Sequence, residues 1–234
     1  MASTLTLQNA VNFATPILKN QPIAVSNWEP GLTAGNIVLQ RMLGAPCRWR
    51  FNRNTFTFPT VSGTTDYTTT IYDLGFMEDQ WIVDASGVIY PLNGALSLVP
   101  DQSQTRPTQM APQGDNNAGT IIWRLSQAPD AVYTVNGVYQ KKAPLLGSYA
   151  SPWAPVPDEF SYIFNLGFLC FTSLLVNDSR FPIFEKWFVG ALLGAQDGLS
   201  EQEKNIFLGN WMADISTVSR AQGRVNQGVA GRGQ

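Results

Sequence analysis

The stretch Cys47–Phe58, CRWRFNRNTFTF, places four aromatic side chains among three arginines within a dozen residues. In an extended chain Trp49 and Phe51 share one face, while Arg48 and Arg50 share the other. This alternation predicts that the chain crosses here from helices into a sheet, with Trp49 and Phe51 buried as a structural joint. Arginines beside aromatics are also typical of single-strand nucleic-acid sites, which combine backbone charge with base stacking, so that alternative stays open.

Helical patterns precede this crossing. Apolar residues recur at helical spacing over residues 5–19 and predict a first helix. A second helix is predicted to begin at a capping box formed by Ser26 and Glu29 and to run to about Leu43. Gly44 follows that position directly and favours the end of the helix there.

A different pattern follows between Thr55 and Tyr139. Six or seven short runs, rich in threonine and aromatic residues, alternate with period two and are separated by Gly, Pro, Asp and Asn. They predict a small antiparallel sandwich or barrel. The polar, proline-rich segment Pro100–Gly119 predicts a long exposed loop within it.

Helical spacing returns in the last third of the chain. An apolar helix is predicted over residues 160–175, where Gly167 would let another helix approach closely, and a further helix over residues 183–193. Ser200 and Glu203 form a capping box that predicts the start of a fifth helix. Its apolar stripe consists of Phe207, Trp211, Ile215 and Val218.

The order of these elements predicts an α+β fold. We expect a helical bundle built from the N- and C-terminal segments, with an inserted small antiparallel β-sandwich or barrel and an extended C-terminal arm. The predicted parts are residues 1–47 and 148–219 for the helical domain, 48–147 for the inserted β domain and 220–234 for the arm.

The composition limits the classes of function that this chain can have. Charged residues make up 14% of the chain, against roughly 25% in ordinary soluble domains, so part of the surface is expected to be buried against other copies or partners. The chain has no histidine, which excludes Ser-His-Asp and Cys-His catalysis and His-ligated metals. Cys47 and Cys170 are expected to be buried free thiols. We therefore expect no enzymatic activity, no metal and no cofactor.

Charge and hydropathy give two further expectations. Fifteen basic residues against 17 acidic ones, a net charge of −2, provide no overall basic field for a nucleic acid. The N-terminus, MASTLTLQNAVNF, lacks the basic region and apolar core of a secretory signal. The most apolar run, Ile163–Val176, is too short to span a bilayer, so no membrane association is expected.

Several short motifs follow one another in a set order over most of the chain. They lie at the predicted crossing, in the middle of the β region, at the start of the third helix, just before the fourth helix and over the fifth. Their residues are Trp49, Phe51 and Asn52; Arg106, Pro107 and Thr108; Trp153, Pro155, Pro157, Asp158 and Glu159; DSRF at 178–181; and GLSEQEKNIFLGNW at 198–211. Together they resemble the head-to-tail adaptor (connector) proteins of tailed bacteriophages, the group that includes the tail tubular A proteins of short-tailed phages.

This resemblance implies a structural protein of the virion neck, made in the host cytoplasm and located at the head–tail junction. Such adaptors form a ring of twelve subunits that joins the portal protein to the next tail or nozzle protein. Packaged double-stranded DNA passes through the ring without sequence-specific contact.

The C-terminal arm is the expected portal-binding element. It is basic and rich in glycine, with no acidic residue after Asp214, and such a segment suits folding on a partner. Arginine side chains form bidentate pairs with carboxylates. Val225 and Val229 are the only aliphatic side chains of the arm that are larger than alanine, and they could fill small pockets on the partner. The expected portal-binding residues are Arg220, Arg224, Val225, Val229 and Arg232.

Two alternative functions remain at this stage. A carbohydrate-binding virion protein would present Trp81 and Trp123 together on one exposed face of the sandwich, although both lie within apolar runs. A single-stranded nucleic-acid binder would need the basic residues to cluster into a continuous groove.

Overall fold

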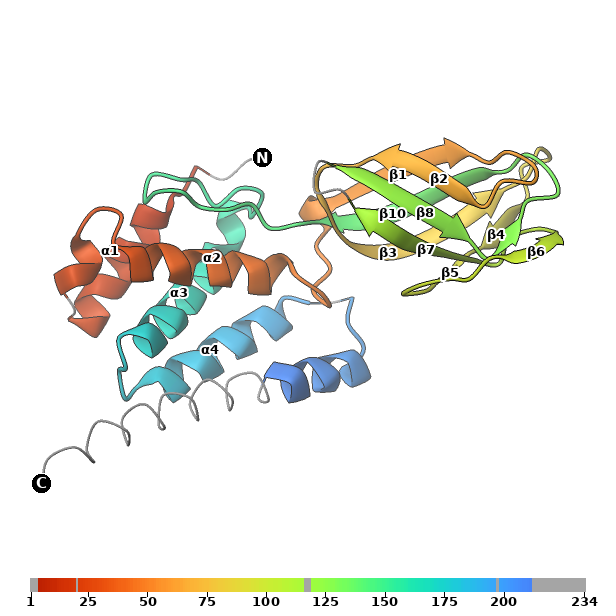
Figure 1. Cartoon of the computed structure of the whole chain (residues 1–234). Coiled ribbons are helices and arrows are strands. Elements are labelled where there is room, and N and C mark those ends of the chain that lie inside the picture. Colours follow the sequence, from red (N-terminus) through yellow and green to blue (C-terminus); the bar gives the residue numbers. More distant parts are fainter. Residues whose placement is uncertain (1–3, 20, 116–118, 197, 212–234) are drawn as a thin grey trace, which may run out of the picture.

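The computed structural model describes residues 4–19, 21–115, 119–196 and 198–211. Helices gather in one region and strands in another, and two stretches of chain cross between them (Figure 1). The predicted α+β class is therefore confirmed.

The helices follow the predicted order with small changes at their ends. The Ser200–Glu203 capping box is present, since the Ser200 backbone N–H donates to Glu203 at 2.9 Å. The box predicted at Ser26 and Glu29 is wrong, because the second helix begins at Glu29 with Trp28 at its N-cap. The helices are α1 Leu7–Leu18, α2 Glu29–Leu43, α3 Ser161–Leu175, α4 Phe181–Gly194 and the helical residues 201–211, with short 3-10 turns at Gln21–Ala24, Arg50–Asn52 and Asp158–Phe160.

Helix α3 lies at the centre of the helical region and packs against α1, α2 and α4. Gly167 makes this possible, as predicted: a Cβ there would lie 2.7 Å from the Phe188 ring and 2.8 Å from a Val38 methyl group. A side chain at position 167 would therefore force apart the helices on either side of α3.

The strands form two four-stranded sheets and one two-stranded sheet. Their spatial orders are β1-β10-β3-β4, β2-β8-β7-β5 and β6-β9, and neither four-stranded sheet closes on itself in the described part of the chain. Their bounds are β1 Arg53–Pro59, β2 Asp66–Thr70, β3 Leu74–Val83, β4 Ile89–Pro91, β5 Asn93–Gly94, β6 Asp101–Gln104, β7 Gln109–Asp115, β8 Thr120–Leu125, β9 Gln127–Ala128 and β10 Thr134–Lys141.

Both four-stranded sheets contribute to one apolar core. Trp123 of β8 is fully buried in it and lies 5.0 Å from the Phe56 ring of β1. The core residues are Phe58, Tyr67, Ile71, Ile82, Leu92, Met110, Ile121, Trp123, Leu125, Tyr133, Val135 and Tyr139.

The predicted loop over Pro100–Gly119 is wrong. Strands β6 and β7 both fall entirely within it, and β7 pairs antiparallel with β8. Met110 and Ala111 are fully buried against this neighbour. Tertiary pairing overrides the polar, proline-containing composition here. Gln109 stays exposed while its neighbours Met110 and Ala111 are buried.

Candidate functional site

Trp49, at the crossing from α2 to β1, is 3% exposed. Its indole N–H donates to the Met42 carbonyl oxygen at 2.6 Å, and its ring lies 5.2 Å from that of Phe51 and 5.0 Å from that of Phe160. Protein atoms cover the indole, so no face of Trp49 is free for a nucleic-acid base to stack on.

Amide side chains connect this crossing to the returning strand β10. Gln140 Nε2 donates to the Trp49 carbonyl oxygen at 2.9 Å, and Asn52 Nδ2 donates to the Lys141 carbonyl oxygen at 2.8 Å. Arg53 pairs with Gln140 in the β1–β10 ladder. The strand that enters the β region and the strand that leaves it therefore run side by side. Trp49 and Phe51 as a joint between domains stay a prediction, but the contacts such a joint requires are present.

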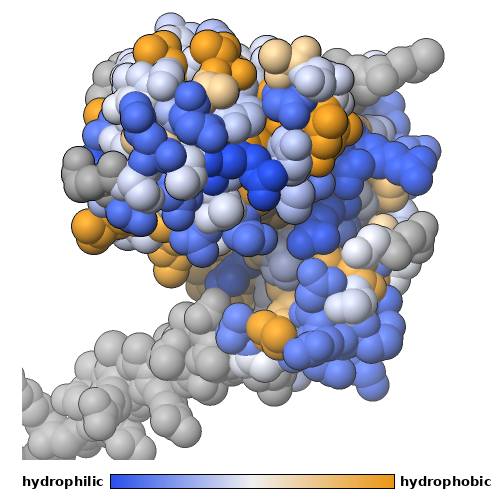
Figure 2. Space-filling model, turned by 90° about the vertical axis from the view of Figure 1, so that its right-hand side faces the viewer, coloured by the Kyte–Doolittle hydropathy of each residue, from blue (hydrophilic) through white to orange (hydrophobic). Residues whose placement is uncertain are grey.

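The three arginines of the opening stretch line a cleft of about 590 Å³ together with Glu159, Ala195 and Gly198. Arg53 forms an ion pair with Glu78 at 2.7 Å, and Arg48 forms one with Glu203 at 3.4 Å. Two of the three guanidinium groups are thus neutralised by carboxylates. Figure 2 shows a hollow between the body of the molecule and its lower part, lined mainly by hydrophilic residues.

A second cluster surrounds Trp211 at the end of the described chain. The Arg41 guanidinium of α2 lies over the Trp211 ring at 5.2 Å, and Trp211 Nε1 donates to a Glu185 carboxylate oxygen of α4 at 2.6 Å. Its ring also lies 5.7 Å from that of Phe188. Trp211 therefore bridges the last helix to both α2 and α4.

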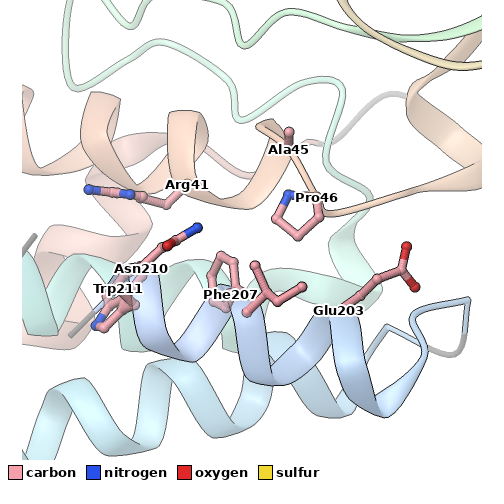
Figure 3. Close-up of a pocket in the computed structure, with 8 residues that line it drawn as sticks. Arg41, Ala45, Pro46, Glu203, Phe207, Asn210 and Trp211 are labelled. Atoms are coloured by element: carbon pink, nitrogen blue, oxygen red, sulfur yellow. The ribbon is translucent and has the colours of Figure 1, made fainter. Parts of the chain in front are cut away.

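Open grooves flank the last helix on both sides. One groove of about 530 Å³ lies towards α2, where Figure 3 shows Arg41, Ala45 and Pro46 across from Glu203, Phe207 and Trp211. The other, also about 530 Å³, lies towards α4 and has a largely apolar lining that includes Val189, Leu193 and Leu208. Of residues 201–211, Phe207 and Trp211 are the two buried side chains.

Exposed apolar side chains lie on the same two helices. Trp187 and Ile183 of α4 are 51% and 52% exposed, and Ile206 of the last helix is 56% exposed. Exposed apolar side chains beside apolar grooves are typical of surfaces that bind other proteins.

The two cysteine thiols of the chain are free and buried. Burial raises the pKa of Cys47 to about 12 and also raises the pKa of Cys170, so both thiols stay protonated at neutral pH. Residues 4–19, 21–115, 119–196 and 198–211 contain no group of three His, Cys, Asp or Glu side chains that could hold a metal ion. No helix within these ranges has the length and apolar character needed to cross a membrane.

The predicted sites are distributed as follows. Trp123 is fully buried in the sheet core while Trp81 is half-buried on β3, so the two tryptophans do not form one exposed platform. Among the motif residues, Trp153 is fully buried and stacks on Phe164 at 4.2 Å. The Arg106 guanidinium lies over the Tyr90 ring at 4.1 Å. These motif residues make contacts within the chain.

The expected portal-binding residues Arg220, Arg224, Val225, Val229 and Arg232 lie outside the described residues, as do Ile215 and Val218. The sequence patterns did not predict that Trp211 contacts two other helices. Its helical stripe was visible, but nothing in the spacing of Arg41 and Glu185 indicates that they meet the same indole ring.

No protein-family profile matches this chain, and no curated protein sequence is significantly similar to it.

Proposed function

We propose that this protein is a structural subunit of the neck of a tailed-phage virion. In this proposal twelve copies form a ring that joins the portal protein to the next tail or nozzle protein and continues the channel for packaged double-stranded DNA. The protein acts by contact with other proteins, not by catalysis.

The observation that carries this proposal is the apolar surface beside the last helix. Ile206 is 56% exposed and lines the groove towards α2. Ile183 and Trp187 of α4 are also about half exposed, in a chain whose charged fraction is only 14%. Such a surface is costly to leave in water and favours assembly. The ordered motifs that resemble phage adaptors give the assembly its identity as a neck ring.

The finer architecture belongs to the same proposal. The packing of α1, α2 and α4 around α3 supports a helical bundle, and the shared core of the two four-stranded sheets supports a sandwich. The antiparallel pairing of β1 with β10 supports an insertion whose two ends leave the bundle together. We propose a bundle that carries this sandwich as an inserted domain, and that ends in the C-terminal arm.

The two alternatives are less well supported. A carbohydrate platform needs Trp123 at the surface, and this side chain is fully buried. A single-strand nucleic-acid site needs free arginines beside an accessible aromatic face, whereas Arg48 and Arg53 are paired with carboxylates and Trp49 is covered.

Deletion of Gln222–Gln234 tests the arm. We expect the melting temperature to stay nearly unchanged, because the deleted segment is glycine-rich and its only aliphatic residues larger than alanine are Val225 and Val229, while stable attachment to the portal is lost. The measurement is native mass after co-expression with the portal protein encoded alongside this chain. Two full-length variants separate the effect of charge from that of geometry. In one, Arg220, Arg224 and Arg232 are all changed to Glu, which reverses the charge. In the other, all three are changed to Lys, which keeps the charge and removes the bidentate geometry.

Normal portal occupancy by the truncated protein would assign attachment to the helical region instead of the arm. Loss of attachment in the Glu variant, with partial retention in the Lys variant, would support pairing of the arginines with portal carboxylates.

A further inference from the structure

The helical region and the β region are joined by two stretches of chain. The two apolar cores have no residue in common among the described positions, so shared apolar packing does not fix the angle between the regions. The chain enters the β region at Arg53, the start of β1, and leaves it at Lys141, the end of β10 (Figure 1). Contacts near these two points are therefore left to hold the orientation.

Open space borders both stretches. The cleft of about 590 Å³ is lined by Arg48, Arg50 and Arg53 of the entering stretch. A second cleft of about 360 Å³ lies between the end of α2 and the start of β3, and Gly44 and Phe76 are among its lining residues. These spaces leave room for the β region to tilt unless polar contacts hold it.

Strand β3 departs from regular pairing where it lies beside the end of β10. The register shifts twice there, which leaves Glu78 and Gly75 of β3 without a partner residue on β10. A β-bulge of this kind bends the strand and changes the direction of a side chain. The first bulge carries the carboxylate of Glu78, whose side chain is only 7% exposed.

Glu78 binds two side chains that belong to the crossing. Its carboxylate accepts a hydrogen bond from Arg53 Nε at 2.7 Å and another from the Gln140 amide Nε2. Gln140 is fully buried, and the same Nε2 donates to the Trp49 carbonyl oxygen at 2.9 Å. Since an amide nitrogen carries two hydrogens, both bonds can form together. Glu78 therefore holds the entering strand directly and holds the Gln140 amide towards the Trp49 segment.

These bonds restrain the crossing more than they stabilise the fold. The desolvation of a buried carboxylate offsets much of its attraction to an arginine. The Arg53 side chain is 46% exposed, so its guanidinium stays hydrated when the carboxylate is removed. A Gln140 side chain that loses one acceptor regains rotamer freedom. Loss of Glu78 should thus free the connection and leave both cores folded.

We propose that Glu78 is a positioning residue that fixes the orientation of the β region relative to the helical region. It acts through Arg53 and Gln140, and it belongs to neither apolar core. The inference concerns a single chain, so it goes beyond the proposed ring and does not depend on it. In a ring, a fixed angle would make the β regions of all subunits point the same way.

The test measures the distance between two spin labels, one in each region. The labels are attached to Asn12→Cys on α1 and to Ser86→Cys in the turn between β3 and β4, which are both exposed positions. Cys47 and Cys170 are buried, so they stay unlabelled. A second pair of labels, at Ser86→Cys and Thr70→Cys, lies within the β region and reports whether its sheets stay intact.

In Glu78→Ala we expect the distribution of the Asn12–Ser86 distance to become about twofold wider, because the connection can then bend as a hinge. Glu78→Gln keeps the shape of the side chain and one acceptor oxygen, so it should give an intermediate width, and it serves as the test if Glu78→Ala does not fold. Asp79→Ala is the matched control and should change nothing. Asp79 is the next residue of β3, and its carboxylate accepts a hydrogen bond from the adjacent Gln80 backbone N–H at 2.8 Å.

The pair of labels within the β region should keep its distance and width in all of these variants. A parental Asn12–Ser86 distribution in both Glu78 variants would show that other contacts hold the angle, and would overturn the proposal. Equal widening of both label pairs, or equal widening in Asp79→Ala, would also overturn it, because the effect would then belong to the sheet and not to the connection. None of these results bears on whether the protein forms a neck ring.

Discussion

Trp49 and Trp211 have almost the same surroundings by simple measures. Each is 3% exposed, each donates an indole hydrogen bond of 2.6 Å, and each lies among aromatic rings. They differ in what holds the segment around them. Trp49 bonds to a backbone carbonyl in a segment that continues into α2 on one side and β1 on the other. Trp211 bonds to a side chain and stands on the last described helix, between two grooves.

The burial of a side chain therefore does not by itself tell how much of the fold depends on it. Removing Trp49 leaves a cavity that the chain cannot close, because both neighbouring elements are fixed in their own cores. We expect the removal of Trp211 to release mainly residues 201–211, because this short segment follows the rest of the helical core. A buried tryptophan can thus belong either to the main cooperative unit or to an element that opens on its own.

The largest expected effect is that of Trp49→Ala. We expect a loss of about 3–5 kcal/mol in the free energy of unfolding, the usual cost of truncating a large buried aromatic. Urea unfolding followed by circular dichroism measures it. Trp187→Ala is the matched control, because this side chain is 51% exposed and should change stability by no more than about 0.5 kcal/mol.

An unchanged melting temperature for Trp49→Ala, together with weaker binding of single-stranded DNA, would reverse the assignment and make the Cys47–Phe58 stretch a stacking site.

Trp211→Ala should have a smaller and more local effect. We expect a loss of about 1–2 kcal/mol, because the cost is limited to releasing residues 201–211. Hydrogen exchange should show these amides losing protection while those of α3 keep theirs. Equal loss of protection in α3 and in the last helix would show that the two form one cooperative unit, and would remove the distinction drawn here.

Acidification should loosen the same helix by a still smaller amount. Hydrogen bonds from the Ser200 backbone N–H and hydroxyl, followed by the Arg48 charge, lower the pKa of Glu203 below its usual 4.5. A carboxyl group whose pKa is lowered by folding supports the folded form above its usual pKa, and this support is lost as the pH falls through the lowered value. Protection factors of residues 201–211 should therefore fall below about pH 4.5, relative to those of α2.

In Glu203→Gln this pH dependence should be absent, since the amide does not titrate. A pH dependence of equal size in this variant would attribute the change to another group.

The smallest expected effect is that of a thiol reagent on the native protein. The chain has two cysteines, both buried, and burial raises the pKa of Cys47 to about 12. We expect almost no reaction with an aromatic disulfide reagent at pH 8, and full reaction of both thiols after denaturation. Rapid reaction of Cys170 alone would indicate opening near the aromatic cluster of α3, α4 and Trp211, and would extend the loosely held element into the helical core.

Sequence patterns predicted the helices well and the β region only in outline. Helical spacing located α1 and α3, and the stop signal at Gly44 marked the end of α2, because those signals are local. The capping box at Ser200 is present, whereas the one predicted at Ser26 is not. Strands β6 and β7 were missed, because their composition is polar and their pairing with β9 and β8 joins segments that no local pattern connects. Burial of Trp49 was expected from its alternation with arginines, whereas its bonds to Met42 and Gln140 depend on tertiary packing.

The contacts of the last helix could not be predicted either. The stripe of Phe207 and Trp211 identified its buried face, but its polar partners Arg41, Glu185 and Arg48 come from three other segments. No spacing within one segment encodes that meeting. The open grooves beside the helix are likewise visible only once α2 and α4 are placed.

The central claim is that the protein is a ring-forming structural subunit of a phage neck. Cryo-electron microscopy of this chain co-expressed with its portal protein tests it most directly. The proposal predicts a closed ring of identical head-to-tail contacts stacked on the portal, with twelve subunits. A two-fold dimer, or a portal ring with none of this protein bound to it, would contradict the claim.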